Sequence, residues 1–372
     1  MKLVIAEKPS VARDIAAVIG ADENVDGIMR GNGYLVTSAR GHLVRLKEPQ
    51  EYDSRYGKWN LSDLPIIPEF EFVPIDNAKD VLSRLDKLMN STEVDEIICA
   101  TDAGREGECI FRYIYNYVGC KKPFKRLWIS SLTAESIRNG FNHLLPAAAK
   151  DNMYAAGITR AKIDWIWGMN MTRLYTKHFG ALCSVGRVQT AVVNMIVQRD
   201  EEISNFTKKP YFKLKLDNGA EWFSDELDMD SFSTRAEAES VKAKCENSIC
   251  KVVLVNAKQK KENRPLLFSL TSLQVEANDK LGFSAATTLA VMQSLYEKKM
   301  LTYPRTDSSY LTEDMAAVLE ERVGMVRVMN EAADDVLAAG LNIDSRIINN
   351  SKVSDHHAII PTEYIANAAG AE

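Results

Sequence analysis

Three acidic residues stand where two predicted strands end, and they are the first candidates for chemistry. Glu7 follows an apolar run over residues 2–6, and Asp102 follows a second apolar run over residues 96–101. Glu106 comes about one helical turn after Asp102. Mg²⁺ takes oxygen ligands and keeps several of its waters, so one or two carboxylates suffice to hold it. The three acids therefore predict a Mg²⁺ site, with unrelated loop acids as the simpler alternative.

A tyrosine opens the segment Tyr-Pro-Arg-Thr-Asp-Ser over residues 303–308. A phenol attacks phosphorus only when nearby positive charge or a base activates it, because its ordinary pKa is about 10. Arg305 lies two residues after Tyr303, so in a strand the two side chains would share a face. Arg305 would then hold a phosphate with two parallel hydrogen bonds while the phenol attacks. The chain has 13 tyrosines, so a structural role for this one is the competing interpretation.

Two further segments could contact phosphate. The histidine pair His356 and His357 points to two different sides, so a single histidine that donates to a phosphate oxygen is more plausible than a metal chelate. The segment Ser-Val-Gly-Arg-Val-Gln over residues 184–189 precedes a predicted helix and could present backbone N–H groups to a phosphate. A surface loop and an ordinary helix start are the respective alternatives.

The elements that must position these residues follow from hydrophobic spacing. After the run over residues 2–6, Pro9 suits a first helical position, and Val11, Ile15 and Val18 recur at helical spacing. The run over residues 96–101 is likewise followed directly by a helical pattern. Strands followed by helices predict a parallel, doubly wound α/β sheet, which binds ligands beyond the carboxyl ends of its strands. Glu7 and Asp102 would both lie at that edge.

The rest of the chain changes period several times. Residues 151–202 read as helical, whereas residues 211–216 alternate and residues 252–255 are strand-like, which predicts a mostly β segment. After Pro265 two helical patterns flank Gly282, and residues 300–303 read as a short strand. Two helices across a turn and then a strand are typical of a winged helix-turn-helix.

The net charge of −5, from 46 Lys and Arg against 51 Asp and Glu, at first argues against a nucleic-acid partner. However, residues 217–240 carry −7 and residues 311–344 carry −6, which leaves +8 on the remainder. Residues 121–138 carry +4, and residues 160–177 carry +3 and interleave Trp165, Trp167 and Tyr175. Basic and aromatic side chains together suit single-stranded nucleic acid, and a solvated helix face over an aromatic core is the alternative.

Several functional classes are excluded by what the sequence lacks. It has no GxxxxGK[ST] motif for a nucleotide phosphate and no HExxH motif. Its six cysteines form no CxxC pair, so they read as reduced cytosolic thiols. No apolar run approaches the roughly 18 residues of a membrane span, and the first apolar stretch is too short for a signal peptide. We therefore expect a cytoplasmic protein without an ATP site.

Taken in order, the motifs of this chain resemble those of the type IA DNA topoisomerases, closest to the bacterial topoisomerase III group. The eight segments that carry the resemblance cover nearly the whole chain, and they are residues 6–10, 41–43, 100–108, 164–173, 184–189, 267–274, 303–308 and 356–362.

The resemblance implies four parts. Residues 1–150 would form a Toprim domain with a Rossmann-like α/β fold, and residues 151–205 the first part of a helical DNA-binding domain. Residues 206–264 would begin a β-rich gate domain, and residues 265–372 a winged-helix-like domain with the catalytic tyrosine.

The resemblance also implies an activity. The family relaxes negatively supercoiled DNA and separates linked DNA molecules without ATP, through Mg²⁺-dependent cleavage of one strand and a 5′-phosphotyrosine link. Tyr303 would be the nucleophile, Glu7 the general acid and base, and Arg305, Lys8 and His356 the phosphate contacts. Glu7, Asp102 and Glu106 would hold the metal. The residues expected to bind single-stranded DNA are Arg160, Gly168, Arg173, Ser184, Val185, Gly186, Arg187, Val188, Gln189 and Arg305. The implied location is the cytoplasm, at the nucleoid or a plasmid, and no helicase partner can be named.

Two departures from the family pattern shape the expectations. Many members carry Asp-x-Asp-x-Glu, whereas Gly104 stands in the middle position here, so one potential metal ligand is missing. Family members also continue well past the segment at residues 356–362, so we expect an incomplete strand-passage gate, with cleavage retained and relaxation weak. The alternatives are a Toprim-type nuclease or primase, and a fragment that only binds single-stranded DNA.

Overall fold

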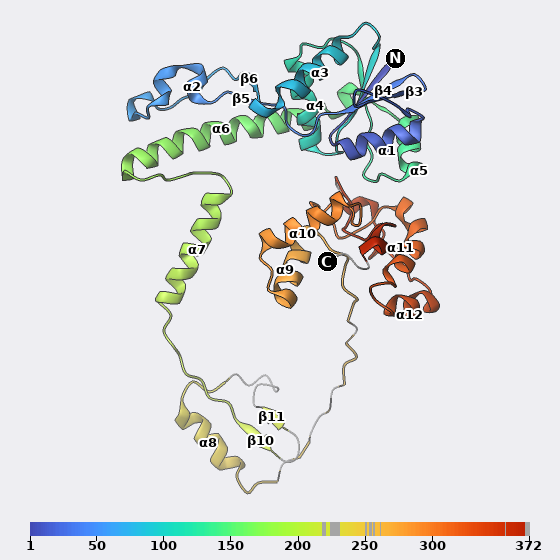
Figure 1. Ribbon diagram of the computed structural model, residues 1–372. Helices are drawn as coiled ribbons and strands as arrows, with labels where there is room; N and C mark the ends of the chain where they lie inside the picture. The colour runs from blue at the N-terminus through green and yellow to red at the C-terminus, as the bar shows by residue number, and fades with distance from the viewer. Residues whose placement is uncertain are drawn as a thin grey trace. The chain divides into compact units, whose positions relative to one another are not determined.

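The computed structural model, shown in Figure 1, describes residues 1–217, 221–223, 231–249, 251–252, 255, 257–260, 262–353 and 355–368. The chain forms two compact units. One comprises Met1–Gly186 with Pro265–Glu372, and the other comprises Arg187–Arg264. The strand predicted over residues 252–255 and much of the acidic segment 217–240 lie outside the described residues.

The first unit is built on a sheet whose centre is parallel, which confirms the predicted α/β fold of the N-terminal part. Strand β1 pairs in parallel with β4 and β7, and β7 pairs in parallel with β8, while β2, β3 and β9 form antiparallel edges. Because Ala6 lies opposite Ala100, the chain leaves β1 and β7 at the same edge. The strands are β1 (Lys2–Ala6), β2 (Glu23–Val25), β3 (Ile28–Gly31), β4 (Tyr34–Ser38), β7 (Glu96–Ala100), β8 (Phe124–Arg126) and β9 (Leu145–Pro146).

Both faces of this sheet are covered by helices. Alternate residues of β1 enter different cores: Leu3 and Ile5 pack with α3 (Lys79–Asn90) and α4 (Arg105–Tyr117), whereas Val4 and Ala6 pack with α1 (Pro9–Ile19) and α5 (Ala134–Asn142). Each fully buried Leu, Ile or Val side chain contributes about 1.5–3 kcal/mol. The two cores thus hold β1 and β7 rigidly, and with them the loops that follow.

The long helix α6 (Asp151–Phe179) is clamped by an excursion from the sheet domain. That excursion contains β5 (Val44–Leu46), α2 (Pro49–Tyr52) and β6 (Phe72–Pro74). The indole N–H of Trp165 donates to the carbonyl oxygen of Lys47 at 2.9 Å. The side chain of Asn170 accepts from the N–H of Ile66 at 2.6 Å and donates to its carbonyl oxygen at 2.9 Å. The helical pattern predicted over residues 151–202 is confirmed as two helices, since it is interrupted after Phe179 and resumes at Gln189, and part of the aromatic content of the first is core.

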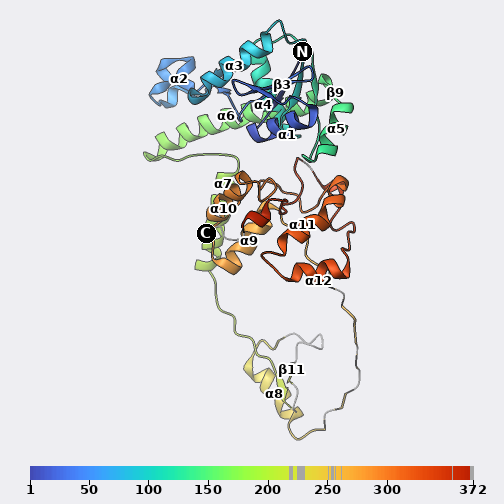
Figure 2. The same cartoon turned by 45° about the vertical axis from the view of Figure 1, so that its right-hand side comes forward.

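The C-terminal part of the first unit contains the two predicted helices, α9 (Leu270–Leu281) and α10 (Ala285–Glu297), which lie against each other in Figures 1 and 2. They are followed by α11 (Leu319–Val326) and α12 (Ala332–Ala339) around a small core that includes Leu311 and Ile360. The short strand predicted over residues 300–303 is wrong, because only Leu301 makes a single bridge, to Pro361. The segment runs instead as an extended loop.

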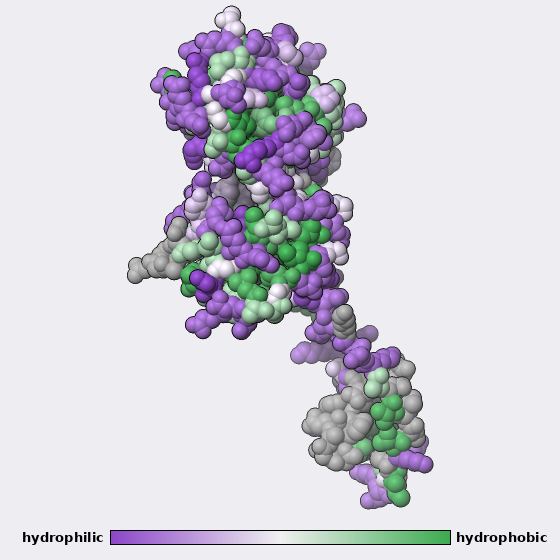
Figure 3. All heavy atoms as spheres, turned by 90° about the vertical axis from the view of Figure 1, so that its right-hand side faces the viewer, coloured by the Kyte–Doolittle hydropathy of each residue, from purple (hydrophilic) through white to green (hydrophobic). Residues whose placement is uncertain are grey.

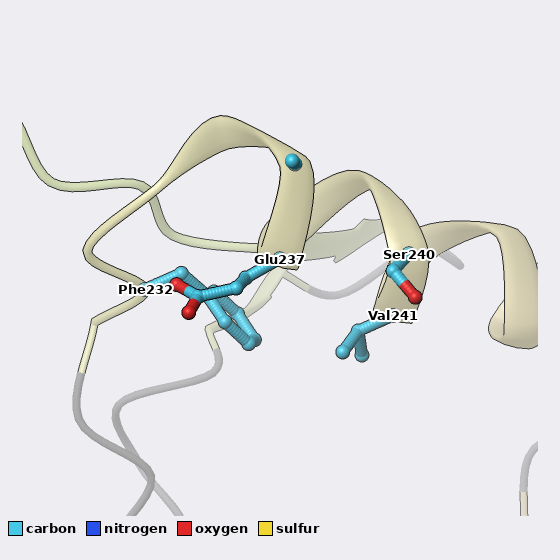
Figure 4. Close-up of a pocket in the computed structure, with 5 residues that line it drawn as sticks. Phe232, Glu237, Ser240 and Val241 are labelled. Carbon is cyan, nitrogen blue, oxygen red and sulfur yellow. The ribbon is translucent and has the colours of Figure 1, made fainter.

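The second unit contains α7 (Gln189–Ser204), the strands β10 (Lys215–Asp217) and β11 (Glu221–Phe223), and α8 (Arg235–Cys245). We expected a mostly β segment here, and α8 is a correction to it. A hollow in this unit is lined by Phe232 together with Ala236, Glu237, Ser240 and Val241 of α8 (Figure 4). Its one ionisable side chain, Glu237, caps the first turn of α8 with Thr234. The hollow is therefore unrelated to the predicted chemistry.

The surface is mixed in hydropathy: on the face drawn in Figure 3, apolar side chains gather in patches among hydrophilic ones. Within the part of the chain that the structure describes, no helix has the length and apolar content needed to cross a membrane.

Candidate functional site

The loop between β7 and α4 carries Asp102, and a glycine lets the helix pack onto it. A side chain at Gly107, in the first turn of α4, would overlap the backbone carbonyl of Asp102. The hydroxyl of Thr101 also donates to the carbonyl oxygen of Gly107 at 2.7 Å. The helix thus begins directly on the loop, and the position of Asp102 is set by backbone packing.

A buried ion pair fixes the same loop from below. The guanidinium of Arg126, on β8, donates to the carbonyl oxygens of Thr101 at 2.7 Å and Asp102 at 2.6 Å. Its Nε lies 3.0 Å from a carboxylate oxygen of Glu108, and both side chains are almost fully buried. The other oxygen of Glu108 accepts from Nε of Arg112 at 2.9 Å. Buried charges persist only when they are paired in this way.

The carboxylate of Asp102 is held by a lysine and a histidine. Its Oδ2 lies 2.9 Å from Nζ of Lys8 and 3.3 Å from Nε2 of His356. Burial opposes ionisation of this group, but the hydrogen bond from His356 and the charge of Lys8 outweigh burial and hold the pKa of Asp102 well below its usual range. In turn, although burial opposes the charge of Lys8, Asp102 raises the pKa of Lys8. The site therefore keeps a carboxylate and an ammonium, both ionised, side by side.

Tyr303 lies against this pair. Nζ of Lys8 is 3.7 Å from the centre of the Tyr303 ring, and the ring of His356 is 4.4 Å from it, centre to centre. On another side, Tyr296 of α10 packs edge-on at 5.3 Å between ring centres. A cation over an aromatic face is attracted to it, so Lys8 and the Tyr303 ring hold each other in place.

Backbone pairing places Tyr303 and His356 on one side of the C-terminal part. The N–H of Thr302 donates to the carbonyl oxygen of Ile360 at 3.0 Å, and the hydroxyl of Thr302 accepts from the N–H of Ile360 at 3.0 Å. Four residues on, the hydroxyl of Thr306 donates to the carbonyl oxygen of His356 at 2.9 Å. The two loops therefore run side by side, although about 50 residues separate them in sequence.

Glu7 completes the group from the end of β1. Its Oε2 accepts from the backbone N–H of Asp102 at 3.3 Å. Burial, and then the negative charge of Asp102, raise the pKa of Glu7. A carboxyl group with a raised pKa is better able to donate a proton near neutral pH, which is what a general acid must do.

These side chains border a cavity of about 910 Å³ between α1 and the loops that carry Tyr303 and His356. Its walls include Lys8, Asp102, Tyr303 and His356, together with the cations Arg13 and Arg322. The walls also carry acidic side chains, so their charge is mixed; these acids are Asp14, Asp102, Glu297, Glu321 and Glu363.

The predicted metal ligands do not form a metal site in this arrangement. Among the residues that the structure describes, no group of three or more acidic, histidine or cysteine side chains is placed to hold a metal ion. Oδ2 of Asp102 already contacts Lys8 and His356, and a carboxylate oxygen of Glu106 lies 2.6 Å from Nε2 of His42. A cation at these acids would have to displace those partners, so we derive no chemical step through a metal.

Two arginines are placed differently from the expectation. Arg305 is exposed and lies outside the lining of the cavity, and the shared face with Tyr303 fails because the segment is not a strand. Arg173 is buried: its Nη1 donates to the carbonyl oxygen of Tyr56 at 2.8 Å, and it stacks on Trp59. Burial lowers the pKa of Arg173. We expected Arg173 to bind DNA, but its burial and its contacts give it a structural role instead.

The remaining predicted DNA-binding residues fall on α6 and on the chain that follows it. Arg160 is half-exposed and pairs with Asp164 at 3.7 Å, and Trp167 is exposed. The hydroxyl of Thr172 accepts from the N–H of Val185 at 2.9 Å, so that Val185 lies beside Gly168. The other predicted residues follow α6 in the chain. Gly186 is partly buried, and the exposed ones are Ser184, Arg187, Val188 and Gln189.

Three neighbours of the site were not predicted from the sequence as functional residues. His42 belongs to a segment that was quoted for the resemblance, but its contact with Glu106 was not foreseen. Tyr296 is the second-last residue of α10, and no sequence signal separates it from a core aromatic. Asp355 precedes the histidine pair, and its carboxylate lies against Gly104. The glycine at position 104, where many family members carry Asp, was the one sequence signal that could have suggested a side chain from elsewhere packing there.

Three comparisons with known proteins, by family, by curated relatives and by solved structures, agree with one another. A family described as "DNA topoisomerase" matches residues 148–372, and one described as "Toprim domain" matches residues 2–132. Curated relatives named "DNA topoisomerase 3" are 44% identical in Bacillus cereus (98% of this chain, 51% of the relative) and 41% identical in Shouchella clausii (99% and 52%). A solved structure of full-length topoisomerase I from Thermotoga maritima is similar with a TM-score of 0.60 and 25% identity, over 97% of this chain and 55% of that one. The chain thus spans about half the length of the curated relatives it matches.

Proposed function

Because this chain belongs to the DNA topoisomerase family and contains a Toprim domain, we propose that it cleaves and rejoins one strand of DNA through Tyr303. The observation that carries the proposal is the contact of Tyr303 with Lys8 and His356, which in turn bind Asp102. Residues from two distant parts of the sequence meet there, at the edge where a parallel sheet binds ligands. The proposed substrates are single-stranded DNA and negatively supercoiled DNA.

In the proposed reaction, the phenol oxygen of Tyr303 gives its proton to a solvent water and attacks the phosphorus of a phosphodiester. The bond from phosphorus to the 3′-oxygen breaks, and a 5′-phosphotyrosine forms. Lys8 and His356 stabilise the negative charge that develops on the phosphate oxygens. Glu7 gives its proton to the leaving 3′-oxygen and takes it back on rejoining, a role that its raised pKa supports.

The phosphotyrosine diester preserves the free energy of the broken bond, so rejoining needs no ATP. A Mg²⁺ ion at Glu7, Asp102 and Glu106 stays a prediction from the family resemblance, because Asp102 and Glu106 contact other side chains here and Glu7 accepts from the backbone of Asp102. Arg305 likewise stays a predicted phosphate contact, as do Arg160 and the segment 184–189 for single-stranded DNA.

The test is a covalent adduct. We expect the chain, mixed with an end-labelled single-stranded oligonucleotide and then denatured, to carry label only when the label is on the 3′ side of the cut. Tyr303→Phe should abolish the adduct, whereas Tyr117→Phe, on the exposed end of α4, should leave it unchanged.

The same gel separates the alternatives. A Toprim-type nuclease would release free 5′-phosphate ends whether or not Tyr303 is replaced. A chain that only binds DNA would shift the oligonucleotide in a native gel but give no denaturation-resistant adduct.

A further inference from the structure

Gly104 is the N-cap of α4, and its backbone does not require glycine. Its φ of −149° and ψ of 176° are extended values that any residue adopts. The space around it, however, admits no side chain: a Cβ at this position would overlap the carboxylate of Asp355. The need for glycine therefore comes from a residue about 250 positions away.

Asp355 reaches Gly104 from the loop that also carries His356. The next residue, His356, places Nε2 at 3.3 Å from Asp102 and its ring at 4.4 Å from the ring of Tyr303. The hydroxyl of Thr306 holds the carbonyl oxygen of His356 at 2.9 Å from the other side. Because Asp355 and His356 are adjacent in the chain, a backbone shift at Asp355 would also move the imidazole.

The surroundings of Asp355 act on its carboxylate in both directions, and burial, the largest effect, raises its pKa. Gly104 caps the N-terminus of a helix of 13 residues, where the aligned peptide dipoles favour negative charge. Around Asp355, the charged groups are His356 and Arg105, which attract it, and Asp307 and Asp102, which repel it. A side chain at position 104 would remove the space, and an acidic one would add a further repulsion.

We propose that Asp355 is a positioning residue, which seats on Gly104 and thereby fixes His356 between Asp102 and Tyr303. Gly104 and Asp355 form a matched pair, because the carboxylate of Asp355 fills the space that a side chain at position 104 would need. The proposal rests on the function proposed above, because it assigns the pair to the assembly of the Tyr303 site. A misplacement of a catalytic group by about 1 Å costs on the order of 100-fold in rate.

The test is a double-mutant cycle on the 372-residue chain with two readouts, the rate of adduct formation and the thermal midpoint. The variants are Gly104→Ala, Asp355→Gly and the double variant. Gly57→Ala is the matched control, because a Cβ there meets nothing within 4 Å.

We expect Gly104→Ala to lower the adduct rate roughly 10- to 100-fold and the midpoint by about 3 °C. In the Asp355→Gly background the same substitution should change neither readout, because the alanine then has room. Gly104→Asp, which adds a like charge, should be more damaging than Gly104→Ala. Asp355→Gly alone should also lower the adduct rate, because His356 then loses the neighbour that positions it.

The outcomes separate this proposal from the proposed function. Additive effects of the two substitutions on the thermal midpoint would overturn the matched pair, whatever the enzyme does. Coupled midpoints with an adduct rate that no variant changes would overturn the positioning role. A wild-type chain that forms no adduct would overturn the proposed function and, with it, the role of the pair in that function.

Discussion

At the residue scale, the site is a chain of contacts from Glu7 through Asp102 to Lys8, His356 and Tyr303. The family resemblance predicted these five residues as one site, and the structure brings them together. The sequence could not predict how they pair, because the contacts depend on docking between segments about 200 residues apart. The position of Arg305 was predicted wrongly. The prediction assumed a strand, in which the side chains of residues 303 and 305 share a face, whereas the segment is a loop.

Replacing Lys8 tests this scale. Lys8→Gln removes the ammonium that lies over the Tyr303 ring and beside Asp102, so the developing charge in the transition state loses its nearest cation. We expect the single-turnover rate of adduct formation to fall about 100-fold, the usual cost of losing one such donor. Affinity for the oligonucleotide should change much less.

Lys2→Gln is the matched control. Lys2 lies at the start of β1, is exposed and forms a loose pair with Glu96 at 3.8 Å, so its loss should leave the rate unchanged. Equal rates for the Lys8 variant and the wild type would show that the ammonium takes no part in cleavage.

At the element scale, the strand–loop–helix unit from β7 to α4 is what presents Asp102. The order of apolar runs, with Pro9 at the start of α1, sufficed to predict the parallel centre of the sheet. Helix α8 was missed because its residues were counted only as part of an acidic segment, although Thr234 and Glu237 form a capping box that the sequence displays. The buried pair of Arg126 and Glu108 was not foreseen, because a charged residue in a strand or helix is normally expected at the surface.

Breaking that pair tests the element scale. Glu108→Gln leaves Arg126 buried without its counter-charge and also weakens the bond to Arg112. We expect the free energy of unfolding to fall by about 3–5 kcal/mol, measured as a shift of the urea midpoint by circular dichroism.

The comparison is Glu239→Gln on the surface of α8, where the partner Arg235 is exposed. An exposed pair of this kind contributes less than about 1 kcal/mol. If the Glu108 variant were as stable as the Glu239 variant, Arg126 would not depend on Glu108 for its place under the Asp102 loop.

At the scale of the whole molecule, the net charge of −5 hides an uneven distribution. Two segments, residues 217–240 and 311–344, carry much of the negative charge. The cavity beside Tyr303 has Lys8, Arg13 and Arg322 among the residues of its walls. The sequence indicated this separation through its basic and acidic segments. It did not indicate that α6 belongs with the sheet domain, since that grouping depends on contacts of Trp165 and Asn170 with residues 47 and 66.

Salt dependence tests this scale. If about three phosphates are neutralised by the protein, the logarithm of the association constant for single-stranded DNA should fall with the logarithm of the salt concentration with a slope near −2. Fluorescence anisotropy between 50 and 200 mM salt measures it, with an oligomer of uncharged backbone as the control. A slope of zero would mean that the protein neutralises no phosphates on binding, and it would contradict a role for the local cations.

The most direct test of the central claim identifies the atom that holds the DNA. The adduct formed on a single-stranded oligonucleotide is digested with nuclease and trypsin, and the modified peptide is sequenced by mass spectrometry. We predict a 5′-phosphoryl nucleotide on Tyr303, in the peptide that runs from residue 300 to residue 305. A nucleotide on Tyr296, whose ring lies 5.3 Å from that of Tyr303, or on any other residue, would contradict the account.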